Sequence, residues 1–335
     1  MTNNRILGLD ILRAWAIFCV IAGHFFMNTR FQQHTFEGLS MFVQGSIKFL
    51  FGMGVPLFIM LTGFLNCRKD ISKRYYCGGL RVIGLYLFWS VITCLYLIIY
   101  QGGVIESAVM GILSFSTIRY GWYIEMWIGL FLLVPFLNIL WWNCPSKKHK
   151  LLLIGTLFSI TSVPIFTNRY GVQLTPDYWR ACYPLLFYFV GAYIREYQLR
   201  INKWWWLIIV GICLVNPLFN TLFVKEHSMI QVTGDPSGIF GALLAILFFL
   251  LCYKVDISTK SIRALTTTIS RSALDMYLCS YLFDAVLYPI FKGIFQWQDA
   301  RTAGYYFVFI VPALFGCSLL ASLLRRYVSK TWRPM

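Results

Sequence analysis

Ten apolar segments, each about long enough to cross a lipid bilayer, constrain the fold of this chain more than any other feature of its sequence. Because a segment in hydrocarbon must satisfy its backbone polar groups internally, each is expected to be an α-helix. The chain is 59 % hydrophobic and only 13 % charged, which is too few charges to cover a water-soluble protein of 335 residues. The predicted fold class is all-α, a polytopic membrane helical bundle with about ten transmembrane helices at residues 6–27, 46–66, 80–100, 121–142, 150–166, 182–195, 204–223, 237–253, 272–291 and 303–324.

The lysine and arginine residues predict the orientation of these helices. With the N-terminus inside, twenty of the 29 basic residues lie in interior stretches, eight lie outside and Arg13 lies within the first helix. Cytoplasmic loops of membrane proteins carry the excess of basic residues. Both termini are therefore expected to be cytoplasmic. The net charge of +16 is attributed to this topology, so nucleic acid is not an expected partner.

The loops between the segments are short, and no internal repeat is evident, so residues 1–335 are expected to form a single membrane domain. The ten cysteines stand singly along the chain, without a CxxC pair or a Cys/His cluster. This spacing predicts neither a disulfide framework nor a metal site. Any functional site is therefore expected between helices.

The first apolar segment, Leu7 to Met27, contains Asp10, Arg13 and His24. A charged group in hydrocarbon costs about 2.5–3.5 kcal/mol on insertion scales, so such groups usually face a bundle interior or a water-filled path. At about 100° per residue, Arg13 and His24 lie within about 20° of each other, and Asp10 within about 40° of His24. One face of this helix is therefore expected to be polar. The alternative is a signal anchor with an Asp10–Arg13 pair at the interface and His24 as a buried hydrogen-bonding group.

Five segments agree, in their residues and in their order, with one family of membrane enzymes. They are the Arg-x10-His spacing of the first helix within D-x-L-R-A-x-A-I; P-L-F-I-M-L-T-G-F-L at 56–65; Gly121-Trp122-Tyr123 followed by L-L-V-P at 132–135; Y-P-L-L-F-Y-F-V-G-A-Y-I at 183–194; and I-S-R-S at 269–272 with Tyr277-Leu278. Together these segments resemble the membrane acyltransferase-3 family, bacterial O-acyltransferases that modify sugar hydroxyls.

This resemblance implies a multi-pass enzyme of the bacterial cytoplasmic membrane, an O-acetyltransferase or related acyltransferase. It implies acyl-CoA, most simply acetyl-CoA, as the donor substrate at the cytoplasmic face, with no permanently bound cofactor. The implied acceptor is a hydroxyl of a cell-surface glycan or lipid-linked sugar nearer the outer face. The expected partners are thus the donor, the glycan and membrane lipids.

Arg13 and Arg81 lie near the cytoplasmic ends of the first and third predicted helices, and Asp10 lies one turn before Arg13. A guanidinium group suits phosphates because its planar fork binds two oxygens at once. We therefore expect Arg13, Arg81 and Asp10 to form the donor site. The neighbouring basic loop at 68–74 is also explained by topology and by anionic lipid headgroups.

His24 is the only histidine inside a predicted span, and it lies in the outer half of the bilayer. An imidazole can accept a hydroxyl proton near neutral pH or carry an acyl group covalently, and the sequence leaves both roles open. Two acids expected to be buried, Asp284 and Glu125, could orient the imidazole or bind a sugar. A structural hydrogen bond to a tyrosine or to a neighbouring helix is the alternative for each.

The predicted acceptor-binding residues are aromatic or hydroxyl side chains near the outer boundary: Trp122, Tyr123, Tyr277 and Ser280. Aromatic rings there could stack on a sugar, but membrane proteins also place them at the interface as an aromatic belt.

Two other classes of function compete with the enzyme. A transporter or a glycan polymerase could use buried charges to line a substrate path. A transporter would be expected to have a duplicated half, and a polymerase a large outer loop. The chain shows neither feature. A scaffold protein would leave Asp10, Arg13, His24 and Asp284 unexplained.

Overall fold

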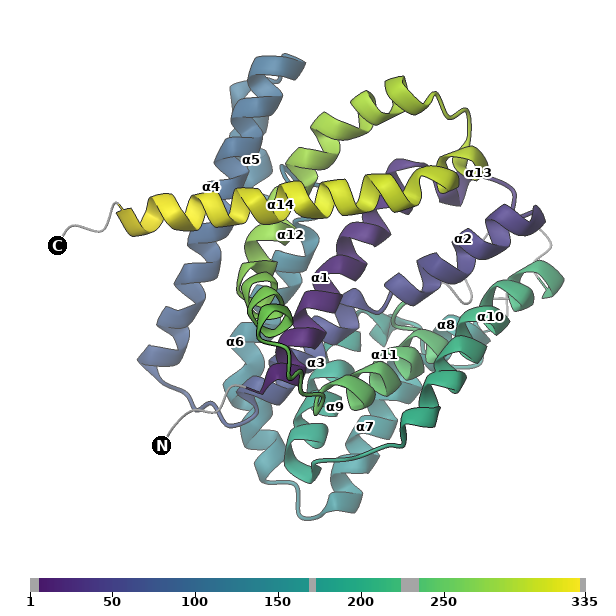
Figure 1. Cartoon of the computed structure of the whole chain (residues 1–335). Coiled ribbons are helices and arrows are strands. Elements are labelled where there is room, and N and C mark those ends of the chain that lie inside the picture. Colours follow the sequence, from purple (N-terminus) through teal and green to yellow (C-terminus); the bar gives the residue numbers. More distant parts are fainter. Residues whose placement is uncertain (1–5, 169–172, 224–234, 332–335) are drawn as a thin grey trace. The chain divides into compact units, whose positions relative to one another are not determined.

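The computed structural model describes residues 6–168, 173–223 and 235–331, and over these residues the chain is helical and has no β-strand (Figure 1). Arg5, Arg169, Lys225 and Arg333, which enter the count of basic residues, lie outside the described residues. The α-helices are α1 Leu7–Asn28, α2 Gly38–Phe51, α3 Gly54–Asn66, α4 Lys73–Gln101, α5 Ile105–Leu113, α6 Trp122–Trp142, α7 Lys147–Thr161, α8 Val163–Thr167, α9 Tyr183–Tyr197, α10 Trp206–Phe223, α11 Ile239–Cys252, α12 Lys260–Phe295, α13 Ala300–Ala303 and α14 Phe307–Thr331. Four short 3₁₀ helices join them, η1 Phe31–Gln33, η2 Tyr178–Cys182, η3 Lys203–Trp205 and η4 Gly304–Tyr306.

The all-α membrane class is confirmed, because seven helical stretches of the described chain are long and apolar enough to cross a membrane. They are Leu7–Asn28, Gly38–Asn66, Lys73–Tyr100, Trp122–Trp142, Lys147–Thr167, Lys260–Phe295 and Ala300–Ser329. The other three predicted segments coincide with α9, α10 and α11. Shorter apolar helices lie at Lys203–Val215 and Ile239–Cys252, and α9 has 15 residues. The count of about ten crossings and the cytoplasmic location of both termini therefore remain predictions.

The helices differ from the expected segments mainly at their ends. Helix α12 is 36 residues long, and it begins at Lys260, well before the expected start at 272. Helix α4 begins at Lys73, where the Ser72 side chain accepts a hydrogen bond from the Tyr75 N–H at 3.2 Å. Such caps satisfy one of the N–H groups left open at a helix start, so a polar residue outside the apolar run sets the boundary.

The chain divides into two compact units, and each is described here by itself. Unit 1 comprises 1–67, 140–270 and 297–308, and unit 2 comprises 68–139, 271–296 and 309–335. Three of the five boundaries fall within α6, α12 and α14, and the other two fall between helices. That residues 1–335 form one membrane domain remains a prediction.

In unit 1, helices α3 and α9 pack backbone against backbone. A Cβ on Gly63 would collide with the carbonyl oxygen of Tyr188, and a Cβ on Gly191 would collide with that of Met60. Small residues allow such close approach of helices in membranes, where burial of apolar surface does not drive association. The two glycines belong to the segments 56–65 and 183–194 that carry the family resemblance. Those segments thus form one helix–helix contact.

In unit 2, aromatic and polar contacts join the helices. Tyr75 of α4 stacks on Phe131 of α6, with ring centroids 4.5 Å apart, and its hydroxyl donates to the Phe131 carbonyl at 2.8 Å. The Tyr86 hydroxyl of α4 donates to the carbonyl of Ile112 in α5 at 2.7 Å. Helix α5, which the apolar pattern did not predict, is thereby attached to α4.

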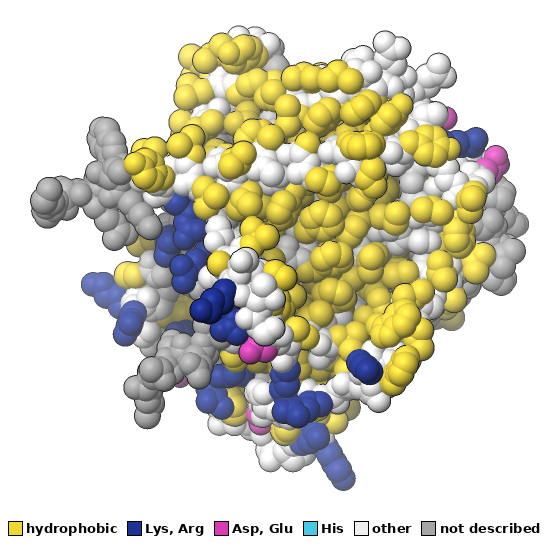
Figure 2. Space-filling model, viewed as in Figure 1, with side chains coloured by type: hydrophobic (Ala, Val, Ile, Leu, Met, Phe, Trp, Pro, Cys, Tyr) yellow, Lys and Arg dark blue, Asp and Glu magenta, His cyan; other side chains and the backbone are white. Residues whose placement is uncertain are grey.

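Hydrophobic side chains make up most of the molecular face in Figure 2. Exposed large apolar residues recur along single helices, for example Leu80, Leu87, Leu95 and Ile99 on α4. A helix with so much exposed apolar surface is suited to lipid rather than water. Together with the seven long apolar helices, this surface is that of a multi-pass membrane protein.

Candidate active site

Helix α1, in unit 1, carries the three ionisable residues predicted to share a face. Asp10 and His24 are buried, His24 at 7 % exposure, and Arg13 is partly buried. Arg13 and His24 are eleven residues apart, which corresponds to about 16 Å along the helix axis. Burying a charged group requires a hydrogen-bonding or charged partner, so the neighbours of these residues determine what they can do.

Ser270 of α12 bridges Asp10 and Arg13 within unit 1. Its hydroxyl donates to Asp10 Oδ1 at 2.6 Å and accepts from Arg13 Nη1 at 3.2 Å. Ser270 is buried, and it belongs to the I-S-R-S segment, for which the only prediction was the family resemblance. One hydroxyl thus contacts both charged groups near the start of α1 and ties α1 to α12.

Replacing Ser270 with alanine is expected to lower the free energy of unfolding by about 1–3 kcal/mol, because a buried carboxylate then loses a hydrogen bond. Thermal unfolding of the purified protein in detergent measures this change. Thr268→Ala is the matched control, since that exposed hydroxyl donates only to the Ala264 carbonyl of its own helix in the described contacts. Equal stability of the two variants would contradict a supporting role for Ser270.

His24 lies near the other end of α1, among aromatic side chains of unit 1. Phe25 and Phe26 next to it pack against Phe307, with ring centroids 5.1 and 5.8 Å apart. The His24 carbonyl accepts a hydrogen bond from Asn28 Nδ2 at 3.0 Å. The His24 side chain itself is buried, so it is shielded from bulk solvent.

In unit 2, Asp284 of α12 accepts a hydrogen bond from the Tyr120 hydroxyl at 2.6 Å. The hydroxyl of Tyr277, two turns earlier on α12, donates to the backbone carbonyl of Tyr120. All three residues are buried. Asp284 thus makes a structural hydrogen bond to a tyrosine, which was the predicted alternative to a catalytic role. Its predicted part in catalysis remains a prediction.

Three of the four predicted acceptor-binding residues are buried. Tyr123 packs edge-on against Tyr277, with ring centroids 5.4 Å apart, and the Ser280 hydroxyl donates to the Tyr277 carbonyl at 2.8 Å. Trp122 alone among the four is exposed. The geometry within unit 2 therefore explains Tyr123, Tyr277 and Ser280 by internal packing, and their acceptor role remains a prediction.

Glu125 was expected to be buried, and this expectation is wrong, because its side chain is exposed. It lies in the first turn of α6, where a negative charge is favourable beside the unsatisfied N–H groups of the helix start. Arg81 is exposed on α4 in unit 2, whereas Arg13 belongs to unit 1. The predicted convergence of the two arginines on one donor therefore remains a prediction, as does a catalytic role for Glu125.

A buried carboxylate that the sequence analysis did not single out is Asp275 of α12, in unit 2. Arg325 of α14 contacts both of its oxygens, Nε to Oδ1 at 2.6 Å and Nη2 to Oδ2 at 2.8 Å. Trp89 Nε1 of α4 also donates to Oδ1 at 3.1 Å. The ion pair and the tryptophan hydrogen bond together join α4, α12 and α14. An aspartate inside the predicted span 272–291 was the available signal.

A second ion pair that the sequence missed lies in unit 1. Lys150 of α7 contacts both carboxylate oxygens of Glu196 of α9, at 2.8 and 2.9 Å. Trp141 Nε1 of α6 donates to Glu196 at 2.8 Å, and the Lys150 ammonium lies 4.9 Å from the ring centroids of both Trp141 and Trp142. The Lys150 residue is only 5 % exposed, so a residue counted as a loop charge instead links α7 to α6 and α9.

Among the described residues, no group of three or more His, Cys, Asp or Glu side chains has the arrangement of a metal site. A comparison with protein families matches residues 6–330 of the chain to a family model described as an acyltransferase domain. No curated protein and no solved structure matches the chain.

Proposed function

Since the chain belongs to the acyltransferase-3 family and is an acyltransferase with several apolar helices that suit a membrane, we propose that it is an O-acyltransferase of the bacterial cytoplasmic membrane. The acyl group, most simply acetyl, comes from acyl-CoA at the cytoplasmic face. It passes to a hydroxyl of a cell-surface glycan or lipid-linked sugar. The excess of basic residues in the stretches assigned to the interior supports cytoplasmic termini and the same sidedness.

The observation that supports this proposal most is the arrangement on α1. Arg13 and Asp10 share the hydroxyl of Ser270 near the start of the helix, and His24 lies about 16 Å further along it. A guanidinium group fixed by a hydroxyl is suited to hold a phosphate of the donor. An imidazole farther along is suited to proton transfer at the acyl end. The two ends of an extended donor thus have separate binding groups on one helix.

In the proposed reaction, the oxygen of the acceptor hydroxyl attacks the thioester carbonyl while neutral His24 accepts the proton of that hydroxyl. The new C–O ester bond forms, the C–S bond breaks, and the leaving CoA thiolate takes up a proton. In the covalent variant, the imidazole nitrogen attacks the thioester first: an N–C bond to the acyl group forms, the C–S bond breaks, and the leaving CoA thiolate takes up the proton that the imidazole loses. In a second step the sugar hydroxyl oxygen attacks the acyl-imidazole, the C–O ester bond forms, the C–N bond breaks, and the hydroxyl proton returns to the imidazole. Both variants use the same side chain and give the same products, an O-acyl sugar and CoA.

Membrane vesicles that contain the protein are expected to transfer label from acetyl-CoA labelled in its acetyl group to a glycan fraction. Inside-out vesicles, which expose the cytoplasmic face, are expected to use added acetyl-CoA directly, whereas sealed right-side-out vesicles are not. Vesicles without the protein are the control. Equal incorporation by vesicles of both orientations, or none by the wild type, would contradict the proposed reaction.

A further inference from the structure

From the loop before α9 we infer a binding site for the sugar acceptor, in which Tyr178 and Trp179 of η2 form a platform that stacks on a pyranose ring. This inference rests on the proposed function and adds the place where the acceptor is held. Tyr178 is 91 % exposed and Trp179 is 52 % exposed. Their rings stand at 79° to each other with centroids 6.2 Å apart, so they offer two differently oriented aromatic faces.

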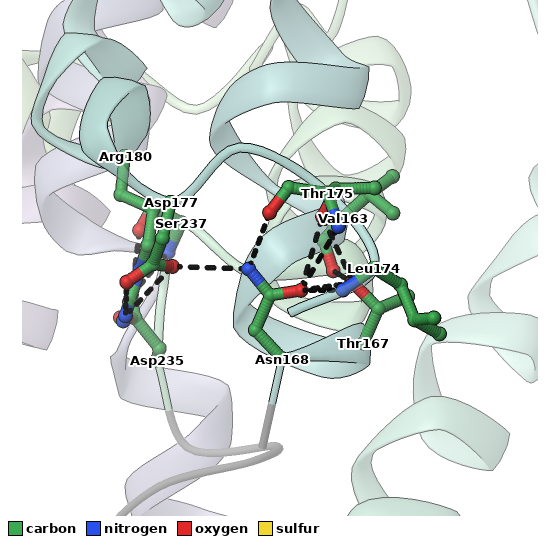
Figure 3. A network of polar contacts seen from close by, with 9 residues as sticks. All are labelled: Val163, Thr167, Asn168, Leu174, Thr175, Asp177, Arg180, Asp235 and Ser237. Carbon is green, nitrogen blue, oxygen red and sulfur yellow. Dashed lines mark hydrogen bonds and ion pairs between the residues drawn. The ribbon is translucent and has the colours of Figure 1, made fainter. Parts of the chain in front are cut away.

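A polar network fixes the backbone that leads into the platform (Figure 3). The Asn168 side chain follows α8 and bonds to the segment 174–177: its Oδ1 accepts from the backbone N–H groups of Leu174 and Thr175 at 3.1 and 3.2 Å. Its Nδ2 donates to the Thr175 carbonyl at 2.7 Å. The Thr167 and Thr175 hydroxyls are also within 3.0 Å of each other. The hydrogen bonds of the Asn168 side chain therefore hold the backbone of this loop, which has no regular secondary structure at 173–177. They preorganise the residues that follow.

Charged groups flank the two rings. Asp177 and Arg180 form an ion pair at 3.4 Å, and each side chain is 43 % exposed. Arg180 Nη2 also lies 4.0 Å from Asp235 before α11, and Asp235 accepts from the Ser237 N–H and hydroxyl at 2.9 and 2.6 Å. The half-exposed Asp177 carboxylate can accept further hydrogen bonds, and the half-exposed Arg180 guanidinium can donate further ones. Both suit the ring hydroxyls of a sugar.

This combination favours a sugar over lipid as the occupant. The apolar C–H face of a pyranose matches an aromatic ring, and its edge of hydroxyls matches a carboxylate and a guanidinium. With the N-terminus inside, five predicted segments precede the loop at 167–181, so this loop is predicted to lie on the outer side, where the acceptor of the proposed reaction is found. Among the residues predicted for the acceptor, Tyr123, Tyr277 and Ser280 are buried, whereas this platform is open to a large ligand.

The test uses the full-length protein in inside-out membrane vesicles made permeable to glycan, with labelled acetyl-CoA and graded amounts of the glycan fraction extracted from the same cells. The double variant Tyr178→Ala, Trp179→Ala is expected to raise the half-saturating glycan concentration about tenfold or more, with the maximal rate within about twofold. Tyr178→Phe, which keeps a ring, is expected to behave like the wild type. Leu174→Ala is the matched control, because that side chain is exposed in the same loop but offers no ring.

An unchanged half-saturating concentration in the double variant would overturn the inference. So would a loss of protein from the membrane with unchanged glycan dependence, which is the result expected of a lipid-interface anchor. If the wild type transfers no label, the proposed function fails, and binding decides the inference separately. In that case purified protein in detergent is titrated with the glycan fraction: binding by the wild type but not by the double variant supports the platform, and any other result overturns it.

Discussion

Alanine in place of His24 is expected to reduce label transfer from acetyl-CoA to glycan by at least about 10²–10⁴, the range typical of general acid–base catalysis. The physical reason is that an imidazole can take the hydroxyl proton at neutral pH, and no other histidine lies within a predicted membrane segment. The same loss is expected if His24 carries the acyl group, because alanine offers no nucleophile. Initial rates in inside-out vesicles, normalised to the amount of protein, measure the effect.

Two further variants separate catalysis from structure at this position. His24→Gln keeps a hydrogen-bonding side chain of similar reach but cannot accept a proton at neutral pH, so it is expected to be as inactive as alanine. His149→Ala removes an exposed histidine whose ring contacts the Ser146 hydroxyl, and is expected to keep full activity. More than about a tenth of the activity in His24→Gln would exclude proton transfer by this side chain. Loss of His24→Ala protein from the membrane would instead indicate a structural role for His24.

Lys150→Met is expected to lower the free energy of unfolding by about 3 kcal/mol, the lower end of the range for breaking a buried ion pair. The variant removes the positive charge beside the Glu196 carboxylate, which still accepts a hydrogen bond from the Trp141 N–H. It also removes the ammonium group that lies beside two tryptophan rings. The lower end applies because the Glu196 side chain keeps 19 % exposure and is partly solvated. Thermal unfolding in detergent measures this loss.

The double variant Lys150→Met, Glu196→Gln removes both charges and is expected to recover most of the stability, because an uncompensated charge causes much of the loss. Lys148→Met, at an exposed neighbouring position on α7, is the matched control and should change stability by no more than about 0.5 kcal/mol. A Lys150→Met protein as stable as this control would show that the ion pair contributes nothing measurable.

The sequence by itself determined the class of fold. Long apolar runs can exist in a membrane only as helices or closed barrels, so their length and composition predict the long helices of the chain without any knowledge of packing. It also determined the family, because the ordered motifs fall where the acyltransferase match covers the chain. The common face of Asp10, Arg13 and His24 follows from helical periodicity within a single segment, which is a local property.

Only the tertiary structure decided which residues meet. Ser270 reaches Asp10 from 260 positions away, and Asp284 is bonded to Tyr120 across 164 positions. Helical periodicity says which residues share a face but not which helix that face meets, so these partners were not predictable. The exposure of Glu125 and the burial of Lys150 are decided in the same way. A charged residue near the end of an apolar run suits either the interface or a buried ion pair, and the choice depends on whether a neighbouring helix supplies the opposite charge.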